Sequence, residues 1–286
     1  MQLGPISLDW LYDADFGLDG GAMFGVVPKI VWQKRYPADD QNFLPLVLRP
    51  LLVRGPGFNL LIDAGYGNKL DEKQRKQFRL SRASDPARVV REFGMDPAAI
   101  THVVFTHMHP DHGGGATSLG PDGEVRPTFP NARVIIQARE YEAMIRPHLR
   151  TKHAYYEANW RPVEEAGLLV QVDGTAEVVP GVTVHLTGGH TQGHQVIVME
   201  GGGVTALHMG DLLPTHAHLN PLWVMAYDDF PMDSIARKSE WLPRARDGNW
   251  WLTFYHDAFM LAGRFDADGK AVEAVEAKSM SGQLTT

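Results

Sequence analysis

Three histidines and one aspartate fall within six residues of this chain, in the stretch HMHPDHGGG that begins at His107. Only 13 of the 286 residues are histidines, so this concentration indicates a shared task. His107 and His109 are two residues apart, so in an extended segment their imidazoles point to the same side. Asp111 and His112 follow a proline that turns the chain, and they can reach a neighbouring point. The spacing therefore predicts ligands for two metal ions at one turn, where the three glycines let the backbone pass close to the site.

Further candidate ligands follow other apolar stretches of the chain. His190 lies in the glycine-rich segment GGHTQGH, Asp211 ends the segment ALHMGD, and His256 follows LTFY. Asp63 holds the same kind of place after NLLI. Side chains on loops that leave the ends of rigid strands commonly build binding sites. We therefore expect these residues to join the cluster at 107–112 in one metal site.

The elements that must position these residues can be read from the same sequence. Short stretches rich in β-branched or aromatic residues, bounded by Gly, Pro, Asn or Asp, predict strands. They cover residues 45–54, 59–65, 100–106, 132–137, 182–187, 194–200, 204–210 and 249–255. A helix is predicted over residues 85–94, where Asp85 can cap it, Pro86 suits its first turn and Gly94 can end it. Two more helices are expected at residues 138–147 and 233–242, so the pattern is that of an α/β chain in which helices cover sheets.

Composition excludes several classes of site and partner. The chain has no cysteine, which rules out disulfides, thiolate metal sites and a cysteine nucleophile. Its net charge of −7 argues against nucleic acid or an anionic membrane as a partner, because both bind basic patches. The first residues lack the pattern of a secretion signal, and no apolar run approaches the roughly 20 residues of a membrane helix. We expect a cytoplasmic protein that acts on a small molecule.

The order THMHPDH, with Asp63 before it and His190, Asp211 and His256 after it, resembles the metallo-β-lactamase fold in its binuclear hydrolase form. The resemblance covers about residues 60–256. It implies a four-layer αββα sandwich. We therefore expect residues 1–286 to form a single domain of this fold, with an N-terminal arm of about residues 1–40.

The resemblance also implies how the ligands are shared between two metal ions. Metal 1 would be held by three histidines, metal 2 by two histidines and an aspartate, and a second aspartate would bridge both ions. In this chain these are His107, His109 and His190 for metal 1, Asp111, His112 and His256 for metal 2, and Asp211 as the bridge. Asp63 would support the ligand loops without binding a metal. Nitrogen and oxygen ligands suit Zn²⁺, with iron, manganese or cobalt as the alternatives.

Such a centre would carry out hydrolysis. Two divalent cations, two aspartates and a bridging hydroxide sum to a net charge of about +1, and metal coordination lowers the pKa of water towards about 7. Hydroxide is then available as a nucleophile at neutral pH. The cations would also stabilise the oxyanion that forms when hydroxide attacks a carbonyl or phosphoryl centre. Asp111 is expected to pass a proton to the leaving group.

Two other segments point to a substrate class. The segments LDGGAMFGVVPKIVWQKRYPADD (residues 18–40) and GDLLPTHAHL followed by WVMAYD (residues 210–228) are similar to bacterial quorum-quenching lactonases of the YtnP-like type and to related organophosphate hydrolases. The resemblance implies opening of the lactone ring of N-acyl-homoserine lactones. An acyl chain needs an apolar trough, which Met23, Phe24 and Trp32 could line. The same residues could instead pack the arm onto the core or onto a homodimer partner.

One position departs from the lactonase pattern. The best-known homoserine-lactone lactonases carry a tyrosine three residues after the bridging aspartate, where this chain has Pro214. The task of holding the substrate could pass to Tyr227, His216, His218 or Tyr255, or to no residue. Two other functions stay open: an organophosphate triesterase or phosphodiesterase that uses the same metals, and a non-catalytic metal-binding module that senses a small ligand.

Overall fold

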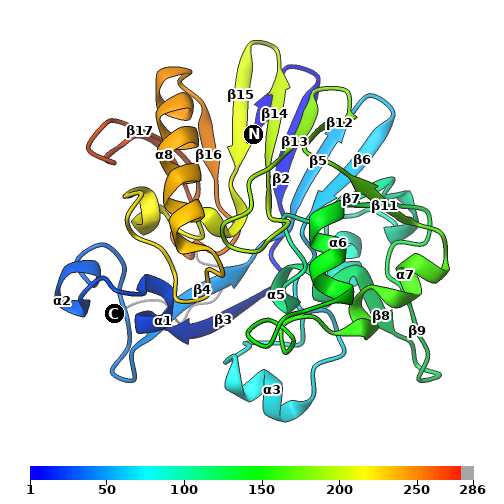
Figure 1. The fold of residues 1–286 in the computed structure, drawn as a ribbon. Coiled ribbons are helices and arrows are strands. Elements are labelled where there is room, and N and C mark those ends of the chain that lie inside the picture. Colours follow the sequence, from blue (N-terminus) through cyan, green and yellow to red (C-terminus); the bar gives the residue numbers. More distant parts are fainter. Residues whose placement is uncertain (278–286) are drawn as a thin grey trace.

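Two seven-stranded sheets form the centre of the molecule (Figure 1) in the computed structural model, which describes residues 1–277. The first sheet has the order β1-β2-β5-β6-β7-β10-β11, and the second has the order β12-β13-β14-β15-β16-β17-β18. The strands of the first sheet are β1 (Gln2–Leu3), β2 (Ile6–Trp10), β5 (Leu51–Gly55), β6 (Phe58–Ile62), β7 (His102–Val104), β10 (Arg133–Gln137) and β11 (Leu169–Val172). Those of the second are β12 (Thr175–Val179), β13 (Val182–Leu186), β14 (Gln195–Gly201), β15 (Val204–His208), β16 (Trp251–Thr253), β17 (Met260–Phe265) and β18 (Ala271–Glu276).

Helices and short hairpins complete the fold. The helices are α1 (Gly20–Phe24), α2 (Lys29–Trp32), α3 (Glu72–Gln77), α4 (Pro86–Glu92), α5 (Pro110–Gly113), α6 (Ala138–Ile145), α7 (Arg161–Glu165) and α8 (Pro231–Asp247). Five short 3₁₀ segments are η1 (Pro97–Ala99), η2 (Gly114–Ala116), η3 (Glu157–Asn159), η4 (Gly210–Leu212) and η5 (His216–Leu219). Two separate hairpins pair β3 (Ala14–Asp19) with β4 (Phe43–Leu48), and β8 (Thr117–Leu119) with β9 (Val125–Pro127). No helix in the described part of the chain is long and apolar enough to span a membrane.

The core is divided into layers by the direction in which each strand residue points. On β5, Val53 faces the second sheet and packs in a cluster with Val184 and Ile197, whereas Leu52 faces the other way and packs with Val89 of α4. This alternation follows from the two-residue repeat of a strand, and both faces of β5 are apolar because both are covered. Outside the second sheet, α8 covers a further cluster of buried residues. The order helix, sheet, sheet, helix confirms the expected four-layer αββα sandwich of the metallo-β-lactamase fold.

The prediction of one strand over residues 45–54 is wrong, because the structure has two separate strands there. β4 ends at Leu48 and pairs with β3, whereas β5 begins at Leu51 and belongs to the first sheet. Between them, the buried Arg49 donates a hydrogen bond to the carbonyl of Asp257 at 2.5 Å, and Pro50 has no N–H for a strand ladder. The chain therefore passes from one sheet to another at these two residues.

Helix boundaries followed the sequence signals more closely. Asp85 accepts a hydrogen bond from the backbone N–H of Arg88, Pro86 is the first residue of α4, and Gly94 beyond its end has a φ of 92°. The helix predicted to end at residue 242 continues to Asp247, with Pro243 inside it. A proline side chain removes one hydrogen bond from a helix, but the tertiary packing of α8 on the second sheet continues past it.

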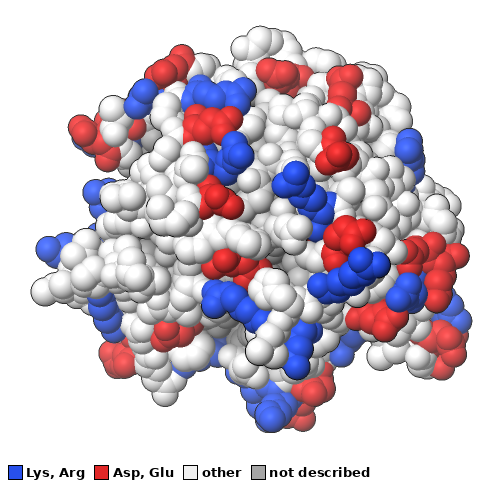
Figure 2. All heavy atoms as spheres, viewed as in Figure 1, with Lys and Arg blue, Asp and Glu red and all other residues white. Residues whose placement is uncertain are grey.

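Residues 1–40 enter two different parts of the fold. β1 and β2 lie at the edge of the first sheet, whereas β3, α1 and α2 pack with β4 at one end of the sandwich (Figure 1). On the face that Figure 2 shows, basic and acidic side chains are interspersed and do not gather into a patch of one sign. That face therefore offers no strong field of a single sign to a charged ligand.

Candidate metal centre

The histidine cluster occupies the connection that leaves β7. His107 and His109 lie in the loop, and Pro110 begins α5, which carries Asp111 and His112. Because proline favours the first turn of a helix, the chain turns at this residue and separates the two halves of the motif. The motif thus presents two residues from a loop and two from a short helix.

The glycines after the motif are required by close backbone contacts. A Cβ atom on Gly115 would lie 1.9 Å from the carbonyl oxygen of Ala64, and one on Gly114 would lie 2.2 Å from that of Tyr66. Both distances are far below any contact that real Cβ atoms make, so only glycine lets η2 lie against the loop that follows β6. That loop also carries Asp63.

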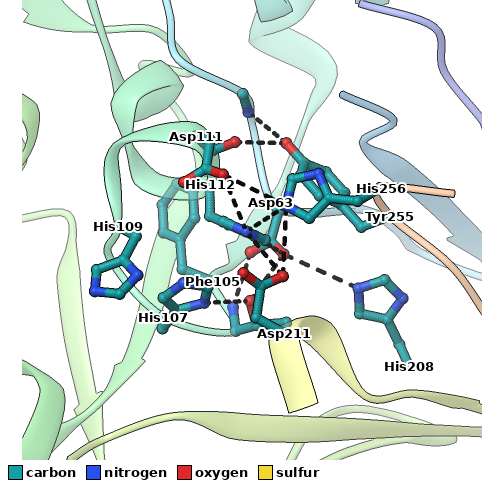
Figure 3. Close-up of polar contacts among 12 residues, drawn as sticks. Asp63, Phe105, His107, His109, Asp111, His112, His208, Asp211, Tyr255 and His256 are labelled. Atoms are coloured by element: carbon teal, nitrogen blue, oxygen red, sulfur yellow. Dashed lines mark hydrogen bonds and ion pairs between the residues drawn. The ribbon is translucent and has the colours of Figure 1, made fainter. Parts of the chain in front are cut away.

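The remaining candidate residues come from the second sheet. His190 lies between β13 and β14, Asp211 lies in η4 after β15, and His256 follows β16. The site is therefore assembled at one end of the sandwich from loops of both sheets. Figure 3 shows Asp211 with His107 and His109 on one side and His256 on the other.

The structure brings the seven residues proposed as ligands together, six of them in two adjoining groups of three. Possible ligand atoms of His107, His109 and His190 all lie within 4.8 Å of one another, and so do those of Asp111, His112 and His256. In the first group, Nε2 of His190 is 3.0 Å from Nδ1 of His109. In the second group, Nε2 of His256 is 3.0 Å from Nε2 of His112 and 3.5 Å from Oδ2 of Asp111.

Asp211 stands between the two groups. Its Oδ2 is 3.4 Å from Nε2 of His190, whereas its Oδ1 is 3.3 Å from Nε2 of His112 and 3.4 Å from Nε2 of His256. Each carboxylate oxygen thus faces a different group. This is the arrangement in which one carboxylate can bind two cations.

One unpaired atom and the charge state of His107 fit a bound cation. Nε2 of His107 is buried and has no hydrogen-bond partner among residues 1–277, while its Nδ1 lies 3.0 Å from Oγ1 of Thr106. Buried polar atoms are rarely left unpaired. Burial, and then the imidazoles of His112 and His190, lower the pKa of His107 well below its usual range. The ring is therefore neutral at pH 7, as a metal ligand must be.

The spacing of nitrogen atoms also suits a small divalent ion. Two nitrogens bound to one tetrahedral Zn²⁺ at about 2.0–2.1 Å are about 3.3 Å apart. The 3.0 Å between Nε2 of His190 and Nδ1 of His109 is close to this separation. The residues present could hold a pair of such ions.

Asp63 connects the start of the motif, at Thr106, with its end, at His112. Its Oδ1 accepts a hydrogen bond from the backbone N–H of Thr106, and its Oδ2 lies 2.9 Å from both Oγ1 of Thr106 and Nδ1 of His112. The residue has a φ of 55°, a backbone conformation that residues other than glycine rarely adopt. The strained backbone is held by these bonds, and Asp63 orients His112.

Three residues hold ligands or ligand loops in place, and nothing in their spacing along the sequence indicated this role. Oδ1 of Asp228 is 2.7 Å from Nδ1 of His190, and so orients that ring. The hydroxyl of Tyr255 accepts a hydrogen bond from the N–H of Gly65 and donates one to the carbonyl of Asp111. Glu140 contacts both ligand loops and is described below. Each belongs to a segment far from its partner in the sequence, so only the fold reveals the contact.

Most of the residues suggested for substrate binding lie in the core. Met23, Phe24 and Trp32 are no more than 1% exposed, and the Phe24 ring stacks on Trp32 and on His218. The structure thus favours the packing alternative for these three, because a substrate could reach them only by displacing packed side chains. We correct the expectation accordingly and leave them out of the proposed substrate site.

The four residues considered as replacements for the lactonase tyrosine differ in what they already bind. His218 uses both ring nitrogens, towards Thr215 and the carbonyl of Met23, and the Tyr255 hydroxyl is engaged as described. His216 is held through Nδ1 by Asp257 at 2.5 Å. Tyr227 is 39% exposed, and its hydroxyl makes no hydrogen bond within the described chain.

Comparison with solved structures shows the same fold in other proteins. A probable metal-dependent hydrolase from Staphylococcus aureus is 37% identical, with a TM-score of 0.92 over 98% of this chain and 100% of that chain. AidC, a dizinc quorum-quenching lactonase in complex with a product, is 19% identical, with a TM-score of 0.79 over 98% of this chain and 97% of that chain. At that identity the likeness shows the fold alone.

Comparison of sequences identifies the family. An N-acyl homoserine lactonase from Bacillus thuringiensis is 29% identical over 113 residues, which are 39% of this chain. The match spans only 38% of the length of that relative. The sequence model of the Metallo-beta-lactamase superfamily matches residues 50–253, which is most of the chain. This chain belongs to the metallo-beta-lactamase superfamily.

Proposed function

We propose that this protein is a binuclear metal-dependent hydrolase that opens the lactone ring of N-acyl-homoserine lactones. The observation that carries the binuclear centre is the position of Asp211, whose two carboxylate oxygens each face a different group of histidines. His107, His109 and His190 would hold one ion, and Asp111, His112 and His256 the other, with Asp211 shared. The nitrogen and oxygen donors suit Zn²⁺, with iron, manganese or cobalt as alternatives. Bound divalent cations would act as Lewis acids that activate water and polarise the carbonyl of the scissile bond.

The residues of the chain would handle the proton. Ring opening adds the oxygen of water to the lactone carbonyl carbon, breaks the ester C–O bond and leaves an alkoxide that needs a proton. Asp111 reaches towards solvent with 14% of its side chain exposed, whereas Asp211 has 9% exposed. Oδ2 of Asp111 is the oxygen that faces the ligand histidines, 3.9 Å from Nε2 of His112 and 3.5 Å from Nε2 of His256. We assign Asp111 as the group that transfers the proton from the attacking water to the leaving oxygen.

Tyr227 is our candidate for holding the lactone. Burial, followed by the charges of Asp111 and Asp19, raises the pKa of Tyr227 to about 12, so its hydroxyl stays protonated at neutral pH. A protonated hydroxyl can donate a hydrogen bond to a carbonyl oxygen of the substrate. His218 and the Tyr255 hydroxyl already use their polar atoms within the protein, and His216 is held through Nδ1 by Asp257.

Apolar side chains beside Tyr227 could receive the acyl chain. Arg150 bonds to the carbonyl of Ala226 at 2.5 Å and to Asp229 at 3.1 Å, so the loop after α6 lies against the segment that carries Tyr227. The exposed Leu149, Phe230 and Met232 lie on these two segments. Apolar side chains exposed in one region are typical of a binding surface.

The lactonase relative from Bacillus thuringiensis supports this substrate class, and the test is direct. The assay measures proton release as purified protein opens the ring of a long-chain N-acyl-homoserine lactone. The rate is compared before chelation, after chelation and after zinc is restored. We expect rapid opening that is lost on chelation and recovered with zinc. A phosphotriester assayed in parallel tests the rival function, and faster turnover of the phosphotriester than of any lactone would replace our assignment. If zinc binds and neither substrate is turned over, the ligand-sensor alternative is favoured.

A further inference from the structure

Glu140 is a fully buried carboxylate outside the proposed ligand set. It lies in the first turn of α6 and is 1% exposed. No lysine, arginine or histidine forms an ion pair with it in residues 1–277. A buried charge is costly unless other groups compensate it. Its hydrogen bonds therefore need explanation.

Four donors compensate the Glu140 carboxylate. Its Oε1 accepts hydrogen bonds from the backbone N–H of Met108 at 2.7 Å and from the Tyr155 hydroxyl at 3.2 Å. Its Oε2 accepts from the Thr191 hydroxyl at 2.6 Å and from the backbone N–H of Gly193 at 3.2 Å. The carboxylate is thus divided, with one oxygen for each of two loops.

The two loops are those that carry the first group of histidines. Met108 stands between His107 and His109, and Thr191 directly follows His190. The first loop leaves the first sheet and the second leaves the second sheet, and within residues 1–277 no strand pairing joins the two sheets. Glu140 is therefore a polar link between the halves of this group.

Two further contacts show that the link is tightly built. A Cβ atom on Gly193 would lie 2.0 Å from the backbone nitrogen of Glu140, so the second loop lies directly against the start of α6. The Tyr155 ring, whose hydroxyl bonds to Glu140, lies with its centroid 5.8 Å from that of His109. These contacts leave little room for either loop to shift independently of α6.

We propose that Glu140 is a positioning residue that holds the His107–His109 loop and the His190 loop at the separation needed to bind one metal ion. The inference rests on the proposed metal centre and is independent of the proposed substrate. It applies to the first group of histidines, because the hydrogen bonds of Glu140 go to the loops of that group and none goes to Asp111, His112 or His256. Loss of Glu140 should accordingly weaken the binding of one of the two metal ions.

The variant Glu140→Gln tests this with almost no change in volume. An amide keeps one acceptor oxygen and replaces the other by an NH₂ group, which can only donate. Whichever way the amide turns, this NH₂ faces the N–H of Met108 or that of Gly193, so one loop loses its backbone hydrogen bond to residue 140. Glu142→Gln is the matched control, since Glu142 lies on the same helix and is exposed. Thr191→Val is a second variant that removes one donor and leaves α6 unchanged.

Zinc binding is the first readout, measured by titrating Zn²⁺ into chelator-treated protein against a chromophoric chelator. Partners that orient metal ligands typically change metal affinity by about 10–100-fold. We expect Glu140→Gln to raise the Kd of one of two zinc equivalents by roughly that factor and the other by much less. Thr191→Val should give a smaller effect in the same direction, and Glu142→Gln should match the wild type. A general loss of stability would instead weaken both equivalents.

Amide hydrogen exchange in the metal-free protein is the second readout. Glu140→Gln should speed exchange at Met108 or Gly193, whereas Glu142→Gln should not. If wild-type protein binds no zinc, the proposed metal centre fails, whatever the exchange data show. If wild type binds two equivalents and Glu140→Gln binds both with unchanged affinity, or loses both equally, the positioning inference is overturned. If Glu140→Gln does not fold, Thr191→Val decides between these outcomes.

Discussion

Lys238 offers a quantitative test of how the site is supported. This residue of α8 is 1% exposed, and its Nζ donates one hydrogen bond, to the carbonyl of Trp223 at 2.6 Å. Burial lowers the pKa of Lys238 from 10.5 to about 7, an effect that the charge of Asp228 partly opposes. Asp228 in turn orients His190 of the proposed metal centre.

The pKa of Lys238 has a consequence for stability with a definite sign. Because the folded pKa of about 7 lies below the usual 10.5, the unfolded chain binds more protons between these two values. Stability should therefore rise with pH across this window. Between pH 7 and pH 9 the single group contributes about 2 kcal/mol, since each pH unit is worth about 1.4 kcal/mol and the folded lysine is half protonated at pH 7.

The assay is urea unfolding of wild type and Lys238→Met in chelator, at pH 7 and at pH 9. Methionine removes the titrating group and fills most of its volume, so the wild type should gain about 2 kcal/mol relative to the variant on going to pH 9. The hydrogen bond to Trp223 is lost equally at both pH values. Lys73→Met, at an exposed position of α3, is the control and should change by less than about 0.5 kcal/mol. A difference between wild type and Lys238→Met that is the same at pH 7 and pH 9 would refute the reasoning.

Three further predictions concern the site and its loops. His109→Ala should remove most of one zinc equivalent, measured by elemental analysis, and nearly all hydrolysis; full activity would contradict the ligand assignment. Tyr227→Phe should lower kcat/KM for lactones by about tenfold, the worth of a hydrogen bond of about 1.4 kcal/mol, at unchanged zinc content. An unchanged kcat/KM would exclude Tyr227 as the substrate donor. Gly115→Ala should unfold at clearly lower urea concentration, because its Cβ would lie 1.9 Å from the Ala64 carbonyl oxygen; an unchanged midpoint would show that the loop can move.

The sequence alone was sufficient to predict the fold and to select the candidate ligands. Local rules decide such features as the start of α4, where Asp85 caps the helix and Pro86 opens it. The motif at 107–112 predicts metal chemistry because its residues are both rare and adjacent, so their proximity does not depend on how the chain folds. The order of Asp63, His190, Asp211 and His256 around it carried the resemblance to the superfamily that the family match confirms.

Other features were decided only by the tertiary structure, because they depend on contacts between distant segments. Apolar residues such as Phe24 look the same in sequence whether they face a substrate or the core, and in this structure they are buried in the core. Glu140 and Asp228 looked like ordinary acidic residues until the fold placed them against the ligand loops. The two oxygens of Asp211 lie near different groups of histidines because loops from both sheets meet at this residue. Residue types set which atoms can bind a metal, whereas packing of the two sheets sets which of those atoms meet.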